Sequence, residues 1–265
     1  MINASVGILT LNSSKSLFKC LNSVKYFNEI IIFDGGSTDS TLNIAKKFKC
    51  RILKQNKKYQ FFNKKIRDFS SLRNELIKNS KFNLVLMLDS DEIISNNCIK
   101  FIDFISKSTI HRNKYYCYLI PRIPKIENVY YKQSNLFPEF QPRLFNKSKF
   151  DKYIKLVHET PFPINRKYKQ LKIKNITIQF NAMFKETKYK YYFEIEKIML
   201  RNKFFISLKF IFFRILVNMK KLYKYIFFKK SNREISNFEG YIIKKNLKYS
   251  FKLLFNKLTF DLFNE

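Results

Sequence analysis

Acidic residues are scarce in this chain, which holds 20 Asp+Glu against 52 Lys+Arg and has a formal charge of +32. That balance excludes a protein that binds cations over its whole surface, and it favours an anionic partner: nucleic acid, a phosphorylated substrate or anionic lipid. Glycine, proline and tryptophan are also scarce, whereas Lys, Asn, Ile, Phe and Tyr are abundant. Because AT-rich codons encode the abundant set, genome composition explains much of the charge equally well, so local patterns carry more weight than the total.

Cysteine pairs with metal-site spacing are absent. The four cysteines, Cys20, Cys50, Cys98 and Cys117, form no CxxC pair, so neither a zinc site nor a disulfide framework is indicated, and we expect reduced thiols. Met1-Ile2-Asn3-Ala4-Ser5 lacks a basic n-region, so we expect no signal peptide. With 46% hydrophobic residues the chain can bury a core, and its length predicts one or two domains.

The first half of the chain alternates short apolar runs with segments of helical spacing. Strands are expected at 6–11, 29–33, 51–53 and 83–88, and helices at 16–27, 41–48 and 70–79, the last capped by Ser70 or Ser71. Strands that are apolar on both faces and alternate with helices predict an α/β fold, with a mostly parallel sheet and helices on both faces. Ligands of such sheets bind beyond the carboxyl ends of the strands.

Three polar clusters, at residues 10–12, 34–39 and 89–92, follow expected strands. Gly35 and Gly36 are adjacent in a chain with only four glycines, which indicates a backbone that needs positive φ or the close approach of a ligand. The free N–H groups of the helix that follows suit a phosphate. The alternative is a tight strand-to-helix turn with Asp39 as N-cap.

The cluster Asp89-Ser90-Asp91-Glu92 concentrates three of the twenty acidic residues. Such close like charges need compensation, and Mg²⁺ or Mn²⁺ takes carboxylate oxygens together with substrate phosphates. The alternative is a helix N-terminus capped by Ser90 or Asp91, with Glu92 in its first turn.

The pattern changes from about Tyr115. Strands are expected at 115–120 and 172–180, and all six prolines (121, 124, 138, 142, 161 and 163) indicate irregular chain between them. Beyond residue 187 the chain is helical, aromatic and basic. We therefore expect a domain over 1–186, made of two halves at about 1–110 and about 111–186, and a helical, basic, membrane-associating region over 187–265.

The stretch between residues 203 and 224 shows how that region could associate with a membrane. On a helical wheel its cations lie within one arc of about 140°, and Phe, Ile and Leu fill most of the rest. Lys209 and Arg214 interrupt any uncharged run of the 18–20 residues that a membrane-spanning helix needs. A helix of this kind suits the plane of an anionic membrane surface. The alternative is that its apolar face packs on the rest of the protein.

Several motifs follow one another in a fixed order. They are Ile8-Leu9-Thr10-Leu11-Asn12, the stretch Glu29 to Asp39, Leu72-Arg73-Asn74, Leu88-Asp89-Ser90-Asp91-Glu92, Arg143-Leu144-Phe145 and Val157-His158-Glu159. Over residues 5–180 the series resembles family 2 glycosyltransferases with the GT-A fold, and within them the subgroup that includes lipopolysaccharide-core glucosyltransferases. The family usually continues Thr-x-Asn with Glu, whereas here Ser13 follows Asn12.

The resemblance implies that the half at about 1–110 is the nucleotide-sugar half and that the half at about 111–186 is the acceptor half. It also implies roles for residues on the donor side. Thr10 and Asn12 line the nucleotide pocket, Asp34 faces the base or ribose, Gly36 lies in the nucleotide-sugar site, and Arg73 contacts the donor.

The resemblance also implies roles at the reacting end. Asp89 lies near the ribose and sugar, and Asp91 holds Mg²⁺ or Mn²⁺ on the diphosphate, whose charge grows as the glycosidic bond breaks. Glu159 is the candidate base for the acceptor hydroxyl, and His158 has a direct role. The alternatives are that Glu159 pairs with surplus lysine and that His158 is a packed aromatic residue.

The expected function is an inverting, metal-dependent transfer of a sugar from a nucleotide-diphosphate donor to a lipid-linked or glycan acceptor, such as lipopolysaccharide core. The resemblance and the basic helix together predict a cytoplasmic protein, peripheral at the inner membrane. A basic nucleic-acid-binding protein and a catalytically silent GT-A scaffold are the alternatives. The acidic strand end at 89–92 argues against a nucleic-acid groove there, so no nucleic-acid partner is expected.

Overall fold

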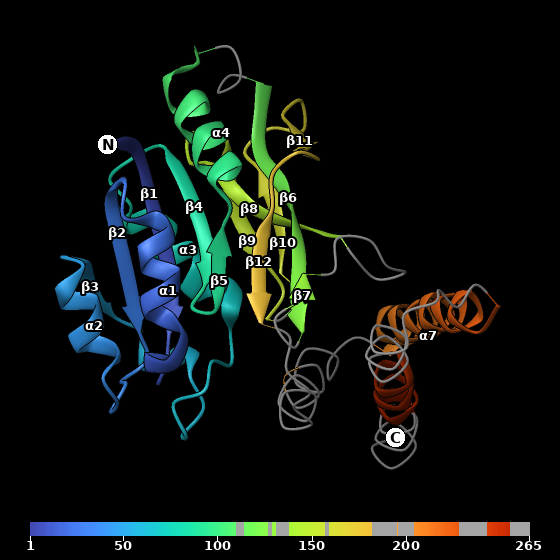
Figure 1. Ribbon diagram of the computed structural model, residues 1–265. Helices are drawn as coiled ribbons and strands as arrows, with labels where there is room; N and C mark the ends of the chain where they lie inside the picture. Colours follow the sequence, from blue (N-terminus) through green and yellow to red (C-terminus); the bar gives the residue numbers. More distant parts are fainter. Residues whose placement is uncertain are drawn as a thin grey trace. The chain divides into compact units, whose positions relative to one another are not determined.

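The computed structural model describes residues 1–109, 114–126, 129–130, 138–156, 159–181, 195, 204–227 and 243–254 (Figure 1). The chain divides into two compact units. Unit 1 comprises Met1–Lys132 and Pro138–Ala182, and unit 2 comprises Gln133–Phe137 and Met183–Glu265. The division between Ala182 and Met183 lies near the boundary expected after residue 186. That expected domain boundary remains a prediction.

Four parallel strands form the first half of the main sheet of unit 1. They are β1 (Ile2–Thr10), β2 (Phe27–Asp34), β3 (Arg51–Lys54) and β4 (Leu84–Asp89), in the order β3-β2-β1-β4. All four expected strands are present, and their parallel pairing brings their carboxyl ends to one edge.

Helices cover both faces of this half (Figure 1). The helices are α1 (Ser14–Val24), α2 (Thr41–Lys47) and α4 (Asn96–Lys107) on one face and α3 (Phe69–Asn79) on the other. Successive strand residues alternate between the two cores, so Ile8 packs under α1 and Leu9 under α3. Gly7 lets α3 approach, since a Cβ there would lie 2.1 Å from Cδ2 of Leu76.

The start of α3 and the end of α1 differ from those expected for identifiable reasons. Helix α3 begins one residue earlier than expected, and its N-cap is Asp68, whose Oδ1 accepts from the N–H of Ser71 at 2.9 Å. Ser70 and Ser71 are therefore inside the helix. Helix α1 ends at Val24, and Phe27 already begins β2. The preference of an aromatic residue for a buried strand decides the structure at Phe27, although Phe27 also continues the helical spacing of the apolar residues before it.

The second half of the main sheet mixes directions. Its strands are β5 (Glu92–Ile94), β6 (Tyr115–Ile126), β7 (Val129–Tyr130), β8 (Glu139–Asn146), β11 (Lys169–Lys172) and β12 (Ile178–Asn181). Strand β8 runs antiparallel to both β4 and β6, and the order continues β4-β8-β6-β12-β5. Strands β9 (Phe150–Ile154) and β10 (Thr160–Pro163) form a separate pair. The single strand expected at 172–180 is thus two strands.

The prolines were a wrong guide to irregular chain in this half. Pro121 and Pro124 lie within β6, Pro142 within β8, and Pro161 and Pro163 within β10. The strand pairings β6–β8 and β9–β10 each contain a shift of register. Such an irregularity in a ladder accommodates proline, which has no N–H donor.

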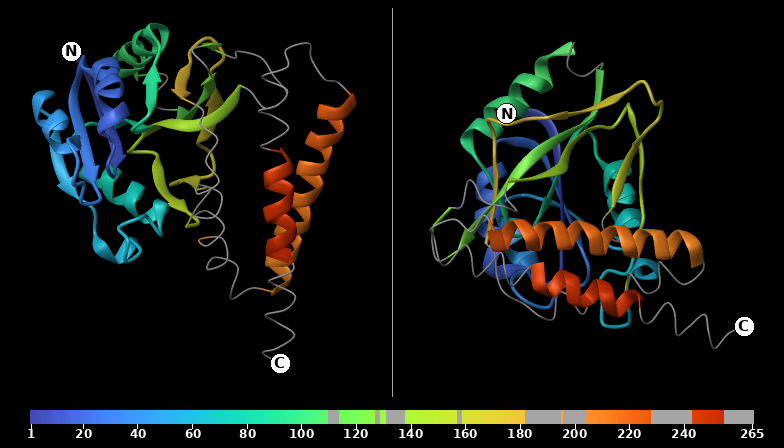
Figure 2. Two further views of the ribbon diagram at one scale, coloured as in Figure 1. Left: turned by 60° about the horizontal axis from the view of Figure 1, so that its bottom comes forward. Right: turned by 90° about the vertical axis from the view of Figure 1, so that its right-hand side faces the viewer.

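Unit 2 contains two described helices that lie side by side, α7 (Phe204–Phe227) and residues 243–254 (Figure 2). Ile211 and Ile215 of α7 pack against Tyr249 and Leu253. The helical content expected for this region is present in both segments. Within the described residues no helix combines the length and the apolar character needed to cross a membrane.

Candidate active site

The three polar clusters meet at one edge of the sheet. Thr10 lies opposite Asp34 in the β1–β2 register, and Leu9 lies opposite Asp89 in the β1–β4 register. The hydroxyl of Ser90 donates to that of Ser13 at 3.0 Å, which joins the turn after β4 to the loop after β1. Segments about 80 residues apart in the chain therefore form one surface.

Asp34 is buried, and hydrogen bonds of neutral groups surround it. Its Oδ1 accepts from the hydroxyls of Thr10 at 2.9 Å and Ser37 at 2.5 Å, and its Oδ2 accepts from the N–H groups of Gly36 and Ser37, both at 2.8 Å. Gly36 has φ 97°, a value that residues with a Cβ rarely adopt. The two glycines thus permit a turn in which backbone donors face the carboxylate.

Asn12 and Asp39 fasten the loops on either side. Oδ1 of Asn12 accepts from the N–H of Thr38 at 2.8 Å, and Asp39 accepts from the N–H groups of Ser14 at 3.1 Å and Thr41 at 2.9 Å. Burial opposes ionisation of Asp39, but these bonds hold its pKa well below its usual range. Ser40, and not Asp39, occupies the N-cap position of α2, so the alternative that made Asp39 the cap is wrong by one residue.

A pocket of about 800 Å³ adjoins this turn. Its walls include residues 34–38, Lys54, Gln55 and Lys57, and Gln60 to Phe62 with Lys64. The volume is in the range of small-molecule sites. Lys64 Nζ donates to the carbonyl of Gly36 at 3.1 Å, which links the pocket wall to the glycine turn. The pocket therefore combines apolar area with positive charge beside Asp34.

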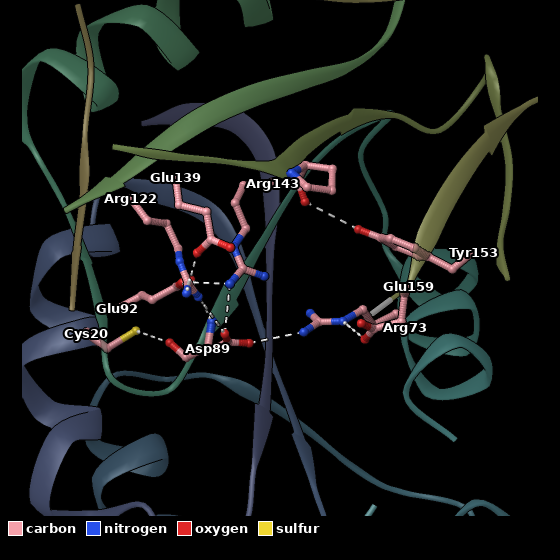
Figure 3. A network of polar contacts seen from close by, with 10 residues as sticks. Cys20, Arg73, Asp89, Glu92, Arg122, Glu139, Arg143, Tyr153 and Glu159 are labelled. Atoms are coloured by element: carbon pink, nitrogen blue, oxygen red, sulfur yellow. Dashed lines mark hydrogen bonds and ion pairs between the residues drawn. The ribbon is translucent and has the colours of Figure 1, made fainter. Parts of the chain in front are cut away.

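Asp89 ends β4 in a different environment, among arginines (Figure 3). Its Oδ1 accepts from Arg73 Nη2 at 3.1 Å, its Oδ2 accepts from Arg143 Nη2 at 2.7 Å, and Arg122 Nη1 lies 3.7 Å from Oδ2. Burial alone would raise the pKa of Asp89, but the guanidinium groups of Arg143, Arg73 and Arg122 hold it well below its usual range.

Glu92 lies behind Asp89 and is fully buried. Its Oε1 accepts from Arg143 Nη2 at 2.6 Å and from Arg122 Nη1 at 3.1 Å, and its Oε2 accepts from the N–H of Asp89 at 3.0 Å. Arg122 also donates to Glu139 at 3.0 Å. Glu92 begins strand β5, so the helix N-terminus considered for this segment is wrong.

Glu159 joins the same network from the other side. Arg73 donates through Nε to Glu159 Oε1 at 2.9 Å while its Nη2 binds Asp89 (Figure 3). Both carboxylates therefore share one buried guanidinium group. The described ion pair of Glu159 is with Arg73. The alternative in which Glu159 pairs with a surplus lysine is therefore wrong for this contact. His158 lies outside the described residues.

Asp91 occupies the two-residue turn between β4 and β5 and is partly exposed. Among the residues that the structure describes, no three His, Cys, Asp or Glu side chains group as a metal cage would require. A Mg²⁺ or Mn²⁺ ion bound with a nucleotide needs only one or two carboxylates beside the phosphates. The donor set at this turn fits that second kind of site.

Sequence reasoning missed Arg122, gave Arg143 no role, and considered Glu92 only as part of an acidic cluster that a metal ion would compensate, whereas Arg122 and Arg143 bind it. A signal for these arginines was present, because Arg supplies only ten of the 52 basic residues. Where composition favours Lys, a retained Arg indicates a site that needs its planar fork. Three of the ten converge here.

Within the described residues, Arg73 Nη1, Arg122 Nε and Arg143 Nε are buried and have no hydrogen-bond partner.

Comparison with known proteins adds a family. The family model described as "Glycosyl transferase family 2" matches residues 5–193. The SPbeta prophage-derived glycosyltransferase SunS of Bacillus subtilis (strain 168) is 40% identical over 90 residues, which is 34% of this chain and 20% of SunS. Glycosyltransferase SunS of Bacillus phage SPbeta matches to the same extent. The chain thus aligns with about a fifth of the length of these relatives.

The matches to solved structures are more distant. Residues 1–349 of S. aureus TarS in complex with UDP-GlcNAc match with a TM-score of 0.48 and 16% identity, over 78% of this chain and 66% of that chain. Glucosyl-3-phosphoglycerate synthase of Mycobacterium tuberculosis, solved with Mn²⁺, UDP and phosphoglyceric acid, matches with a TM-score of 0.35 and 16% identity, over 46% and 43% of the two chains. The family match and the sheet order bear out the GT-A type of α/β fold that the motifs predict.

Proposed function

Because the chain belongs to glycosyl transferase family 2, we propose that it moves a sugar from a nucleotide-diphosphate donor to an acceptor hydroxyl. One observation carries the proposal: polar residues at the ends of β1, β2 and β4 form a continuous edge beside a pocket of about 800 Å³. Open α/β sheets bind their ligands at such an edge.

On the donor side, Thr10, Asn12, Asp34 and Gly36 form the nucleotide pocket. Asp34 faces the ribose or base, and four donors within the protein fix the position of its carboxylate. The lysines of the pocket wall, Lys54, Lys57 and Lys64, supply positive charge for a diphosphate.

At the reacting end, Asp91 holds Mg²⁺ or Mn²⁺. The charge balance of the network supports this assignment. Four carboxyl groups, those of Asp89, Glu92, Glu139 and Glu159, face three guanidinium groups. Among these described ion pairs the carboxylates outnumber the guanidinium groups, and Asp91 lies in the turn beside them. The metal ion, when bound, neutralises the negative charge that develops on the departing diphosphate.

Glu159 is the base of an inverting displacement. The acceptor hydroxyl transfers its proton to Glu159, its oxygen bonds to the anomeric carbon, and the bond from that carbon to the diphosphate breaks with its electron pair on the leaving oxygen. Arg73 orients Glu159 through the 2.9 Å contact to Oε1. Asp89 lies near the donor sugar, and a direct role for the neighbouring His158 stays a prediction.

The acceptor is a surface glycan or glycolipid, such as lipopolysaccharide core, reached at the cytoplasmic face of the inner membrane. Unit 2 supports a peripheral contact with anionic lipid. On α7 the apolar side chains of Phe212, Phe213, Leu216, Met219 and Tyr223 are 52–67% exposed. The neighbouring helix exposes lysines at a spacing of four residues, Lys244, Lys248 and Lys252. Exposed aromatics beside lysines are typical of helices that lie in a membrane interface.

Calorimetry with UDP, UDP-glucose and UDP-GlcNAc, with and without Mn²⁺, tests the transferase. We expect binding of at least one of them that strengthens with Mn²⁺, and product mass from a wider donor screen then identifies the sugar. Absence of binding to any common nucleotide sugar rejects the enzyme. Binding of a donor that is never turned over favours the silent scaffold.

Flotation of the full chain with vesicles containing anionic lipid tests the membrane contact. Leu216→Glu should reduce recovery with the vesicles because it places a charge on the apolar face of α7, where Leu216 is 64% exposed. The matched control is Ile164→Glu in unit 1, where Ile164 is 63% exposed. Equal recovery of the two variants rejects α7 as the contact.

A further inference from the structure

The turn that carries Asp91 is not held by strand pairing. Strand β4 pairs with β1 and β8, and β5 pairs with β12, so among the described pairings no β4–β5 ladder closes the turn at Ser90 and Asp91. The bond from the N–H of Asp89 to Glu92 Oε2, at 3.0 Å, closes it instead. The side chain that follows the turn thus takes the place of the missing ladder.

Two arginines hold the carboxylate of Glu92 in place. Burying a carboxylate is unfavourable unless charged donors compensate it, and Glu92, with no exposed surface, receives Arg143 at 2.6 Å and Arg122 at 3.1 Å. Arg143 Nη2 also binds Asp89 Oδ2 at 2.7 Å. One guanidinium nitrogen therefore joins the carboxylates on both sides of the turn, and Figure 3 shows the three groups converging.

We propose that Glu92, held by Arg122 and Arg143, is a positioning residue that fixes the 89–92 turn in the shape in which Asp91 receives the metal–diphosphate group. This inference rests on the proposed function. Outer groups that orient a metal ligand change metal affinity by about 10–100-fold when they are removed. A purely structural buried carboxylate would change stability and leave metal affinity unaltered.

The chain offers a matched control in Glu29. That carboxylate is also buried, and it binds Arg51 at 3.0 Å, the hydroxyl of Ser5 at 2.5 Å and the N–H of Lys81 at 2.7 Å. It lies opposite Ser5, five residues before the Thr10–Asp34 pair at the polar edge. Glu29 and Glu92 therefore share burial, an arginine and a backbone donor, and differ in whether a turn with Asp91 depends on them.

The experiment titrates Mn²⁺ into the full chain at fixed UDP and follows UDP binding by calorimetry, with thermal unfolding measured alongside. We expect both Glu92→Gln and Glu29→Gln to lower the unfolding midpoint. Only Glu92→Gln should raise the Mn²⁺ concentration for half-maximal binding, by about tenfold. The same Mn²⁺ midpoint in both variants overturns the inference.

Two further outcomes are informative. If Glu92→Gln does not fold, Arg122→Lys carries the test, since it keeps the charge and loses the fork between Glu92 and Glu139. A folded Arg122→Lys with the wild-type Mn²⁺ midpoint overturns the inference, and a raised midpoint supports it. Failure of the wild-type chain to bind UDP with any metal dependence rejects the metal-dependent transferase itself, which separates the two failures.

Discussion

Asp34 and Asp89 end adjacent parts of the same sheet, yet their surroundings differ. The donors to Asp34 are hydroxyl and backbone N–H groups of Gly36 and Ser37, within three residues, and of Thr10 on the neighbouring strand. Asp89 is instead held by guanidinium groups from α3, β6 and β8. One carboxylate has a mostly local environment, and the other has an environment that exists only after the whole sheet has assembled.

The difference suits a division of labour. Four neutral donors hold the Asp34 carboxylate in a fixed geometry at the pocket wall, where the proposed function places the ribose or base. The arginines at Asp89 satisfy that carboxylate, so the neighbouring Asp91 is the acid that the proposed function assigns to the cation. Experiments on the two corners can therefore separate the chemistry of the site from its scaffolding.

The largest effect is expected for Asp91→Ala, which should lower turnover by at least about 100-fold. The reason is that the metal ion that neutralises the leaving diphosphate is no longer held. The fold should survive, since Glu92 still closes the turn through the N–H of Asp89. Turnover is measured by product mass and folding by circular dichroism. Asp103→Ala, which removes an exposed pair with Lys107, is the control and should leave turnover unchanged. Retained turnover in Asp91→Ala would remove the metal role.

The next effect concerns stability. Arg73→Met should lower the free energy of unfolding by about 3–5 kcal/mol, because Asp89 and Glu159 both lose a buried partner. Arg51→Met is the control: Arg51 is 38% exposed, and its partner Glu29 keeps two further donors, so we expect about 1 kcal/mol. Urea unfolding measures both. Equal losses would mean that Arg73 does not bridge the two carboxylates.

Acid should remove the contribution of the Asp89 carboxylate to stability. The pKa of Asp89 is lowered on folding, so its contribution to stability is fully present above its unfolded value of about 3.9 and is lost as pH falls through the folded value. The difference in unfolding midpoint between wild type and Asp89→Asn should therefore shrink below about pH 4 and stay constant from pH 5 to 7. A difference that does not change with pH between 3 and 6 contradicts the ion pairing.

The sequence could predict features that depend on residues close together in the chain, and it could not predict features that form only when distant strands pair. Residues such as Leu17, Cys20, Leu21 and Val24 have the spacing of one helix face, and all four are buried in α1. The four parallel strands and the meeting of Thr10 with Asp34 follow from apolar runs and their order. The family motifs placed Asp89 and Arg73 at the same edge, although the roles assigned to them remain predictions.

What could not be predicted depends on contacts across long stretches of chain. Arg122 meets Glu92 over 30 residues and Arg143 meets Glu92 over 51, and no short motif contains either pair. Pro121 and Pro142 suggested loops because proline lacks an N–H, but the shifted ladder between β6 and β8 accommodates both. Lone residues far apart in sequence, in a mixed sheet, leave no periodic signal.

The smallest effect tests the local side of the comparison. Gly36→Ala should lower the free energy of unfolding by about 1 kcal/mol, because alanine resists the φ of 97° that Gly36 adopts. A Cβ at this position has space, since its nearest neighbour would be Lys64 Cδ at 3.5 Å, so the loss comes from the backbone. Gly36→Asn should lose less, because asparagine adopts positive φ more readily. If urea unfolding shows equal losses for both variants, crowding rather than φ determines the choice of glycine, and the surroundings of Asp34 are less local than those of a single turn.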